Sequence, residues 1–171
     1  MKQFLITVAL IASALVAPSY GSAAMGVRRM EISQPDEGAP ESTLPLVQGA
    51  RNCGGPGRVV AWRFETCGGE GICKIPGDDN QKRQSEFEFI PSQDSEGLGV
   101  RLGVVSDGNT KIVYEKAIAN SAVQGGELYV MNALGGAKKD HIGKTVTLQY
   151  ILYRVDTGDV EVCSEADFMI V

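Results

Sequence analysis

The sequence has little of what most enzymes need. It contains one histidine, His141, within K-K-D-H-I-G, a polar stretch typical of a solvated turn. It has no G-x-S-x-G, no H-E-x-x-H and no glycine-rich loop that could cradle a phosphate. Glu86 and Glu88 alternate with phenylalanines, which indicates that these carboxylates lie on the outer face of a strand and aid solubility. We therefore expect no catalytic residue, no metal site and no cofactor.

The sequence also lacks a strong charge of one sign. It has 16 basic and 21 acidic residues, a net charge of −5. The basic pair Lys138-Lys139 is too short for a nucleic-acid patch, although such a pair could contact a lipid headgroup. A net acidic surface without basic clusters argues against nucleic acid or an anionic membrane as the main partner.

Beyond residue 24 the chain lacks an apolar run long enough to span a bilayer. Residues 1–24 comprise a weakly positive start, an uncharged apolar run from Phe4 to Val16, and small residues up to Ala24. This order is typical of a secretory signal peptide, and a buried N-terminal helix is the other interpretation. Cleavage near Ala24 removes one charge, that of Lys2, and leaves 15 basic and 21 acidic residues, a net charge of −6.

The cysteines are few and unevenly placed. Three of the four lie within R-N-C-G-G-P-G-R-V-V-A-W-R-F-E-T-C-G-G-E-G-I-C, residues 51–73. Four cysteines allow three pairings, and the glycine-rich spacer between Cys67 and Cys73 makes this local pair the most easily closed. The remaining pair, Cys53 and Cys163, would join the first strand of a domain to its last. An oxidising compartment favours disulfides over metal ligation for these cysteines.

The mature chain, residues 25–171, has the size of one domain. Residues 25–49 contain three prolines and no sustained periodicity, so we expect an extended or disordered lead-in there, either a linker or a pro-segment. Residues 50–171 form the expected folded domain.

From Arg51 onward, apolar and polar residues alternate in short runs that glycine and aspartate separate, as in residues 60–65, 98–104 and 146–152. No segment there has the period of an amphipathic helix. Period-two runs of this kind predict an all-β fold, a two-sheet antiparallel β-sandwich.

The alternation also predicts which side chains lie between the two sheets. They are Trp62, Phe64, Phe87, Phe89, Leu98, Val100, Leu102, Val104, Leu128, Val130, Leu148, Tyr150, Leu152, Phe168 and Ile170. Periodicity alone does not distinguish a core that these side chains fill from one that surrounds a cavity. A filled core is the commoner arrangement in β-sandwiches.

Several segments resemble the ML lipid-recognition domain, the family of the Niemann–Pick type C sterol-transfer protein, the mite group-two allergens and fungal phosphatidylglycerol/phosphatidylinositol transfer proteins. The resemblance covers residues 50–171. The segments are N-C-G, G-R-V-V-A-W-R-F-E-T-C, C-G-G-E-G-I-C-K-I-P-G, S-E-F-E-F-I-P, K-T-V-T-L-Q-Y-I-L-Y-R-V and V-E-V-C-S-E-A-D-F-M-I-V.

The resemblance implies an immunoglobulin-like β-sandwich that holds one sterol or phospholipid in an apolar cavity between its sheets. It implies disulfides between the first and last cysteines, Cys53 and Cys163, and between the second and third, Cys67 and Cys73. The implied lipid-cavity residues are Trp62, Phe64, Phe87, Phe89, Val100, Leu102, Val104, Val130, Leu148, Tyr150, Leu152, Phe168 and Ile170.

The function that the resemblance implies is lipid binding, lipid transport and sterol transfer without enzymatic activity. We expect a monomer that is secreted or lies in the endolysosomal or vacuolar lumen, with transient contact to a membrane or a membrane protein and none to nucleic acid. The alternative is a non-enzymatic secreted recognition module that has a packed core and binds a protein partner. A dry core and an exposed apolar patch would favour that alternative.

Overall fold

The computed structural model describes residues 25–36, 38, 41–78, 81–106 and 108–171. The predicted signal peptide, residues 1–24, lies outside the described residues. The elements are β1 (Met25–Ser33), β2 (Arg51–Gly54), β3 (Arg58–Phe64), β4 (Cys73–Ile75), β5 (Arg83–Ile90), β6 (Leu98–Ser106), β7 (Asn109–Ala117), β8 (Tyr129–Ala137), a 3-10 turn η1 (Lys139–His141), β9 (Thr145–Arg154) and β10 (Val160–Ile170). Among the described residues, no helix has the length and hydropathy to cross a membrane.

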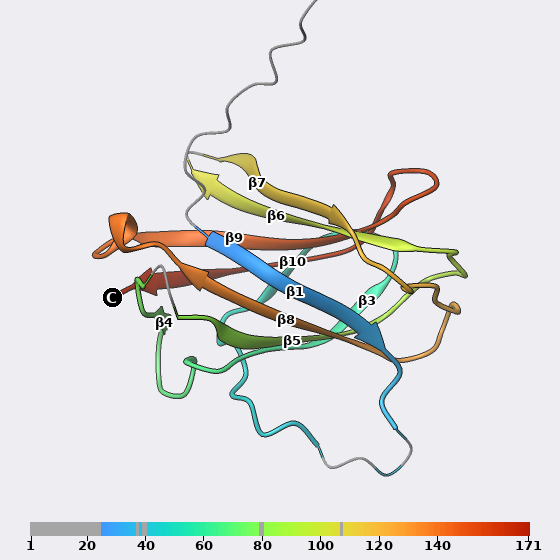
Figure 1. The fold of residues 1–171 in the computed structure, drawn as a ribbon, viewed down its shortest axis with the longest axis horizontal. Helices are drawn as coiled ribbons and strands as arrows, with labels where there is room; N and C mark the ends of the chain where they lie inside the picture. Colours follow the sequence, from blue (N-terminus) through green and yellow to red (C-terminus); the bar gives the residue numbers. More distant parts are fainter. Residues whose placement is uncertain (1–24, 37, 39–40, 79–80, 107) are drawn as a thin grey trace, which may run out of the picture.

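The strands form two stacked sheets (Figure 1). One sheet has the order β1-β8-β5-β3, and the other has the order β2-β10-β9-β6-β7, with β4 added in parallel beside β10. The other pairings are antiparallel. Alternation produces this arrangement because successive side chains of a strand point to opposite faces, and each sheet must bury its apolar face against the other. The predicted all-β, two-sheet antiparallel sandwich is confirmed.

The expected lead-in over residues 25–49 is instead partly a component of the sandwich, so that prediction is wrong. Strand β1 pairs with β8 along its whole length, from Met25 opposite Ala137 to Ser33 opposite Val130. Farther along, the Val47 N–H donates to the Trp62 carbonyl over 2.8 Å, which adds a short stretch beside β3. The prolines of this segment all follow β1, so none removes a hydrogen bond from it. The sandwich therefore begins at β1.

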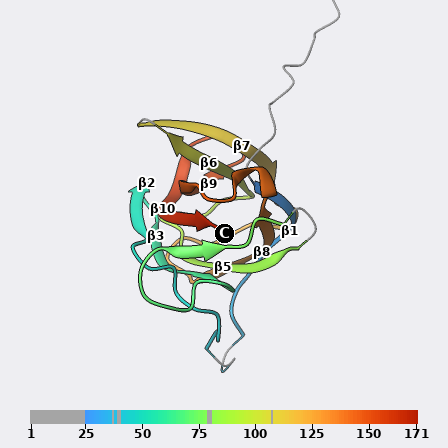
Figure 2. The same ribbon diagram turned by 90° about the vertical axis from the view of Figure 1, so that its left-hand side faces the viewer.

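The two long edges of the sandwich are closed in different ways (Figure 2). On one side, β3 of the four-stranded sheet lies beside β10 of the other sheet. Just after β3, Cys67 is bonded to Cys73 at the start of β4, the strand that pairs with β10. This disulfide therefore ties one sheet to the other. On the opposite side, the outer strands β1 and β7 approach each other, and side chains alone join the sheets in the described part of the chain.

The second disulfide lies within the six-stranded sheet. Cys53 on β2 is bonded to Cys163 on β10, with the Cα atoms 5.0 Å apart. Two residues later Gly55 has φ +88°, and a Cβ atom there would lie 2.4 Å from the carbonyl oxygen of Glu161. Glycine is required at this position because both the conformation and the close approach exclude a side chain. Both predicted disulfides are present.

We predict that the two disulfides stabilise the protein unequally. The partners are 110 residues apart in one and 6 residues apart in the other. In the chain-entropy model the long loop contributes about 4–5 kcal/mol and the short loop about 2 kcal/mol. Urea unfolding of Cys53→Ala/Cys163→Ala and of Cys67→Ala/Cys73→Ala measures both losses. A larger loss for the second variant would show that tying the sheets together outweighs loop entropy.

Candidate functional site

The candidate site is the apolar interior between the two sheets. With one exception, the residues predicted to line a cavity face this interior. Those that are buried are Trp62, Phe64, Phe87, Phe89, Val100, Leu102, Leu148, Tyr150, Leu152, Phe168 and Ile170. Val104 is half-buried and packs against them. Leu98 was also expected in the interior, and it is fully buried.

Val130 is the exception, and its placement in the interior is wrong. It lies directly opposite Glu88 on β5, so both side chains point away from the other sheet. Leu128, which we also expected inside, borders the same outer groove as Val130. The run Leu128–Leu134 is apolar in both phases of the alternation. For that reason period two did not determine which residues face inward.

Two strands supply interior residues that the sequence analysis missed. On β8 these are Tyr129, Met131 and Ala133, all buried. On β1 they are Val27, Met30 and Ile32, which pack half-buried against the core. The alternation of Met30, Glu31 and Ile32 was a usable signal for β1, although it was short.

Aromatic side chains join the sheets in the half of the interior beside the tied edge. The rings of Trp62 on β3 and Tyr150 on β9 are 5.0 Å apart, and those of Trp62 and Phe168 on β10 are 5.3 Å apart. The Phe87 ring stacks on Tyr150 at 5.8 Å, and the Phe64 ring lies 6.1 Å from that of Phe168. Such ring pairs stabilise by about 0.5–1.5 kcal/mol beyond the area that they bury. This half of the interior, which we call the aromatic half, is filled.

The other half, which we call the aliphatic half, lies between β8 and β1 on one side and β6 and β7 on the other. No ring pair bridges the sheets here within the described part of the chain, and the β8 positions Ala133 and Ala137 carry small side chains. The apolar residues here are only partly covered. We call this side the open edge; it consists of Val27, Met30 and Ile32 on β1 and Val113 and Tyr114 on β7. The apolar interior thus reaches solvent along the open edge.

Polar groups inside the sandwich are few and mostly partnered. The Trp62 indole N–H donates to the Ser85 hydroxyl over 3.3 Å. Burial raises the pKa of Tyr150 to about 12, and a hydrogen bond with Ser85 opposes part of that rise. At one end of the sandwich the buried Glu161 carboxylate accepts a hydrogen bond from the Ser92 N–H and lies 3.8 Å from the Arg154 Nε. None of these groups pairs a nucleophile with a base.

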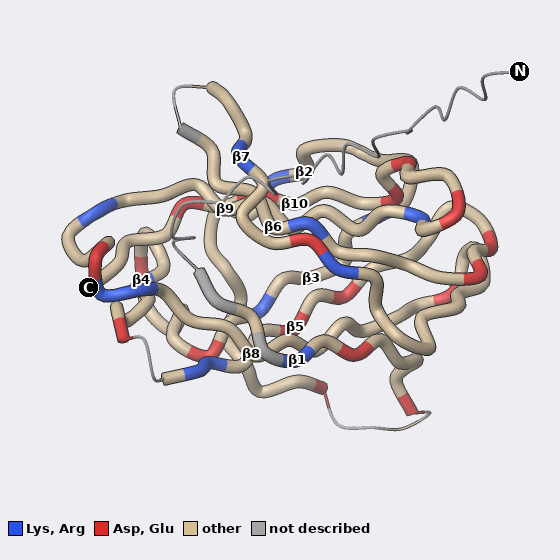
Figure 3. The backbone as a smooth tube through the Cα atoms, turned by 45° about the horizontal axis from the view of Figure 1, so that its top comes forward, with Lys and Arg blue, Asp and Glu red and all other residues tan. Residues whose placement is uncertain are grey.

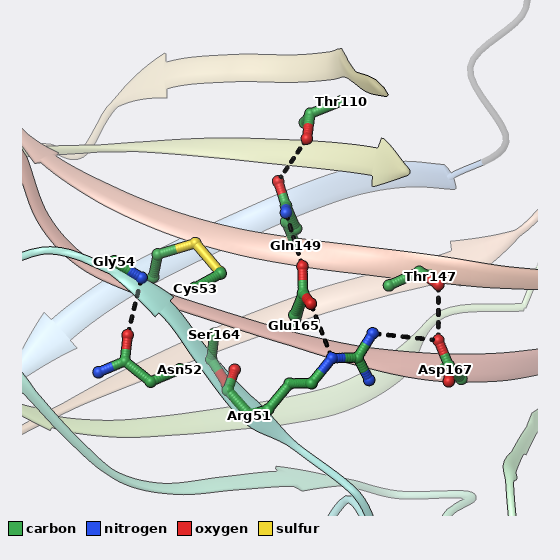
Figure 4. A network of polar contacts seen from close by, with 11 residues as sticks. Arg51, Asn52, Cys53, Gly54, Thr110, Thr147, Gln149, Ser164, Glu165 and Asp167 are labelled. Atoms are coloured by element: carbon green, nitrogen blue, oxygen red, sulfur yellow. Dashed lines mark hydrogen bonds and ion pairs between the residues drawn. A yellow bond between two sulfur atoms is a disulfide. The ribbon is translucent and has the colours of Figure 1, made fainter. Parts of the chain in front are cut away.

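The outer face of the six-stranded sheet carries a row of polar side chains that crosses β7, β9, β10 and β2 (Figure 4). Glu165 accepts hydrogen bonds from the Gln149 amide and the Arg51 guanidinium, each over 2.7 Å. The bond from Gln149, together with that from Arg51, lowers the pKa of Glu165. Gln149 in turn accepts from the Thr110 hydroxyl over 3.0 Å. Because these groups satisfy one another, the row stabilises strand order and offers no free group for chemistry.

Charged residues of both signs are interspersed along the backbone (Figure 3). Glu88 forms an ion pair with Arg63 at 3.0 Å, and Glu86 accepts from the Ser42 hydroxyl over 2.7 Å. Both carboxylates lie on the outer face, as expected. His141 is in η1, and no group of three potential metal ligands is present among the described residues.

Comparison with solved structures agrees with this architecture. The fold is similar to that of a Niemann–Pick type C2 protein from the Japanese carpenter ant, with a TM-score of 0.55, 12% identity, and coverage of 71% of this chain and 98% of that chain. It is also similar to the C-terminal domain of Wzt, with a TM-score of 0.51, 11% identity, and coverage of 74% and 80%. No family model and no curated protein matches the sequence. At such low identity the likeness establishes the fold alone, a two-sheet antiparallel β-sandwich like that of the Niemann–Pick type C2 protein.

We predict that stability declines as Tyr150 ionises. Its pKa is about 12 in the folded chain and near 10 when unfolded, so its contribution is complete below pH 10 and is lost as the pH rises through about 12. A difference of about two units corresponds to at most about 3 kcal/mol. Urea unfolding between pH 8 and 12 measures the decline. Tyr150→Phe should remove most of this decline in unfolding free energy, and the control Tyr153→Phe should remove less of it. Identical pH profiles for wild type and Tyr150→Phe would contradict the assignment to Tyr150.

Proposed function

We propose that this protein binds and transfers one lipid, a sterol or a phospholipid, whose apolar body lies between the two sheets. The observation that carries the proposal is the difference between the two edges. The Cys67–Cys73 disulfide holds the sheets together on one side. On the other side, half-buried apolar residues of β1 and β7 reach solvent without a covalent tie. A ligand that entered there would meet these apolar side chains.

Lipid affinity in such a site would come from removing apolar surface from water. That removal contributes about 25 cal/mol for each Å² before the costs of ordering the ligand. The half of the interior nearest the open edge, which contains the buried residues Val100 and Leu102 of β6 and Met131 and Ala133 of β8, is the part that we assign to the lipid. The sheets would part there while the aromatic half stays closed. Exchange would then require movement of β1 and β7 only.

No enzymatic step belongs to this proposal, because binding and release make and break no covalent bond. The disulfides are consistent with a secreted protein or one in the endolysosomal or vacuolar lumen. We infer transient contact with a donor or acceptor membrane and a monomeric carrier.

A second candidate is a recognition module with a filled core that binds a protein partner. The ring contacts of Trp62 and Phe87 with Tyr150 favour it, because they close half of the interior in the structure. The two candidates differ in the aliphatic half. A carrier takes up lipid there, whereas a recognition module keeps that half dry and closed.

Native mass spectrometry tests the proposal directly. Protein purified from a secreting eukaryotic host should carry a one-to-one adduct of lipid mass, and extraction should identify the lipid class. A clean ligand-free mass, together with no uptake of a fluorescent sterol or phospholipid, would leave the recognition module as the surviving candidate.

A pair of tryptophan substitutions locates the lipid. Val100 is fully buried in the aliphatic half, and Val130 lies on the outer face of the opposite sheet. Val100→Trp should abolish lipid uptake with little loss of stability, and Val130→Trp should leave uptake unchanged. In a filled core, Val100→Trp would instead overpack and cost about 1–3 kcal/mol of unfolding free energy. Equal uptake by all three proteins would place the lipid elsewhere.

A further inference from the structure

The inner face of β7 carries two lysines. In an antiparallel pair, residues directly opposite each other point to the same face of the sheet. Lys116 lies opposite Val100 and Lys111 lies opposite Val104, and both valines face the interior. Tyr114, opposite Leu102, lies between the two lysines on the same face. The two lysines are an odd number of residues apart, which in a regular strand would place them on opposite faces. The irregularity in the ladder between Leu102 and Gly103 shifts the alternation by one residue, so both lysines lie on the inner face.

These lysines differ in their surroundings from two arginines of the sandwich, Arg101 and Arg63. Arg101 on β6 pairs with Glu115 at 2.8 Å on the outer face, and Arg63 on β3 pairs with Glu88 at 3.0 Å. Neither Lys111 nor Lys116 has a carboxylate within ion-pairing distance among the described residues. Both are exposed at the rim of the open edge while their strand contributes half-buried apolar residues to it. The rim thus combines apolar surface with positive charge that has no ion-pair partner in the described part of the chain.

Unpaired lysines on an edge strand can also serve to prevent pairing with a second chain. That role requires charge on the strand, and it predicts that the affinity for a bound lipid does not depend on the headgroup. A ligand site makes a different demand, because an ammonium at the mouth of an apolar interior favours an amphiphile whose charged end is negative. The two roles are therefore separable by measuring lipid selectivity.

We propose that Lys111 and Lys116 form a headgroup subsite, and that the ligand is an amphiphile with an anionic phosphate or carboxylate headgroup. This inference rests on the proposed function, since the apolar part of the ligand must lie between the sheets for its headgroup to reach the rim. The headgroup lies at the open edge beside Tyr114, in contact with water and with one or both ammonium groups. Partly exposed ion pairs of this kind are weak and sensitive to salt, so they select among lipids without supplying most of the affinity.

The test compares two fluorescent lipids with identical acyl chains, phosphatidylglycerol and phosphatidylcholine, on the full secreted chain. We expect wild type to bind phosphatidylglycerol about three- to tenfold more tightly, as one or two exposed ion pairs allow. Lys111→Gln/Lys116→Gln should lose this preference and keep its affinity for phosphatidylcholine. The matched control, Lys74→Gln/Lys144→Gln, removes two exposed lysines on β4 and before β9 and should keep the preference. The wild-type preference should also shrink between 50 mM and 500 mM salt.

Each other outcome overturns the inference in a recognisable way. Equal binding of both lipids by wild type would reject the headgroup subsite while leaving the lipid-binding function in place. Loss of the preference in the control variant as well would assign it to overall charge. Uptake of neither lipid would reject the proposed function itself. Displacement of the bound lipid by glycerol phosphate alone would indicate an anion site that does not require the acyl chains. A Lys111→Gln/Lys116→Gln variant that aggregates with unchanged selectivity would assign the lysines to edge protection.

Discussion

The rest of the structure depends on the contact between the two sheets at the edge where β3 meets β10. There the Trp62 and Phe64 rings of one sheet pack against Tyr150 and Phe168 of the other. The Cys67–Cys73 disulfide holds the end of β3 to β4 and, through it, to β10. Rings and disulfide act at the same edge, so the relative position of the sheets is determined there. The opposite edge, formed by β1 and β7, has no disulfide between the sheets within the described residues.

The two edges of the sandwich therefore differ. At the far edge β1 and β7 are each the last strand of their own sheet, and the apolar residues on their inner faces are half-buried. Parting the sheets at this edge would break side-chain contacts and no backbone pairing within the described residues. In the function that we propose, the aromatic edge is the hinge and the open edge is the mouth through which an apolar ligand enters. Under the same proposal, Lys111 and Lys116 of β7, which have no ion-pair partner among the described residues, lie at that mouth.

Much of this fold could be predicted from the sequence, because strict alternation carries the information. Residues 98–104 have apolar side chains in one phase only, and residues 146–152 do so with the exception of Ile151. Their inner faces were assigned correctly. Leu128–Leu134 is apolar in both phases, so Val130 was assigned to the wrong face. Strand β1 was missed because its stability comes from pairing with β8, a partner about 100 residues away that local pattern does not reveal. The orientation of Lys111 and Lys116 likewise depends on register, which only the paired strands define.

Photolabelling tests the central claim most directly. A phospholipid with a diazirine at the end of one acyl chain is bound to the wild-type protein, irradiated, and its attachment mapped by peptide mass spectrometry. If the lipid lies in the aliphatic half, the label should be found on β6 and β8 residues that face the interior, such as Val100, Leu102 and Met131. Label confined to outward residues such as Val130, or no label at all, would contradict a lipid site between the sheets.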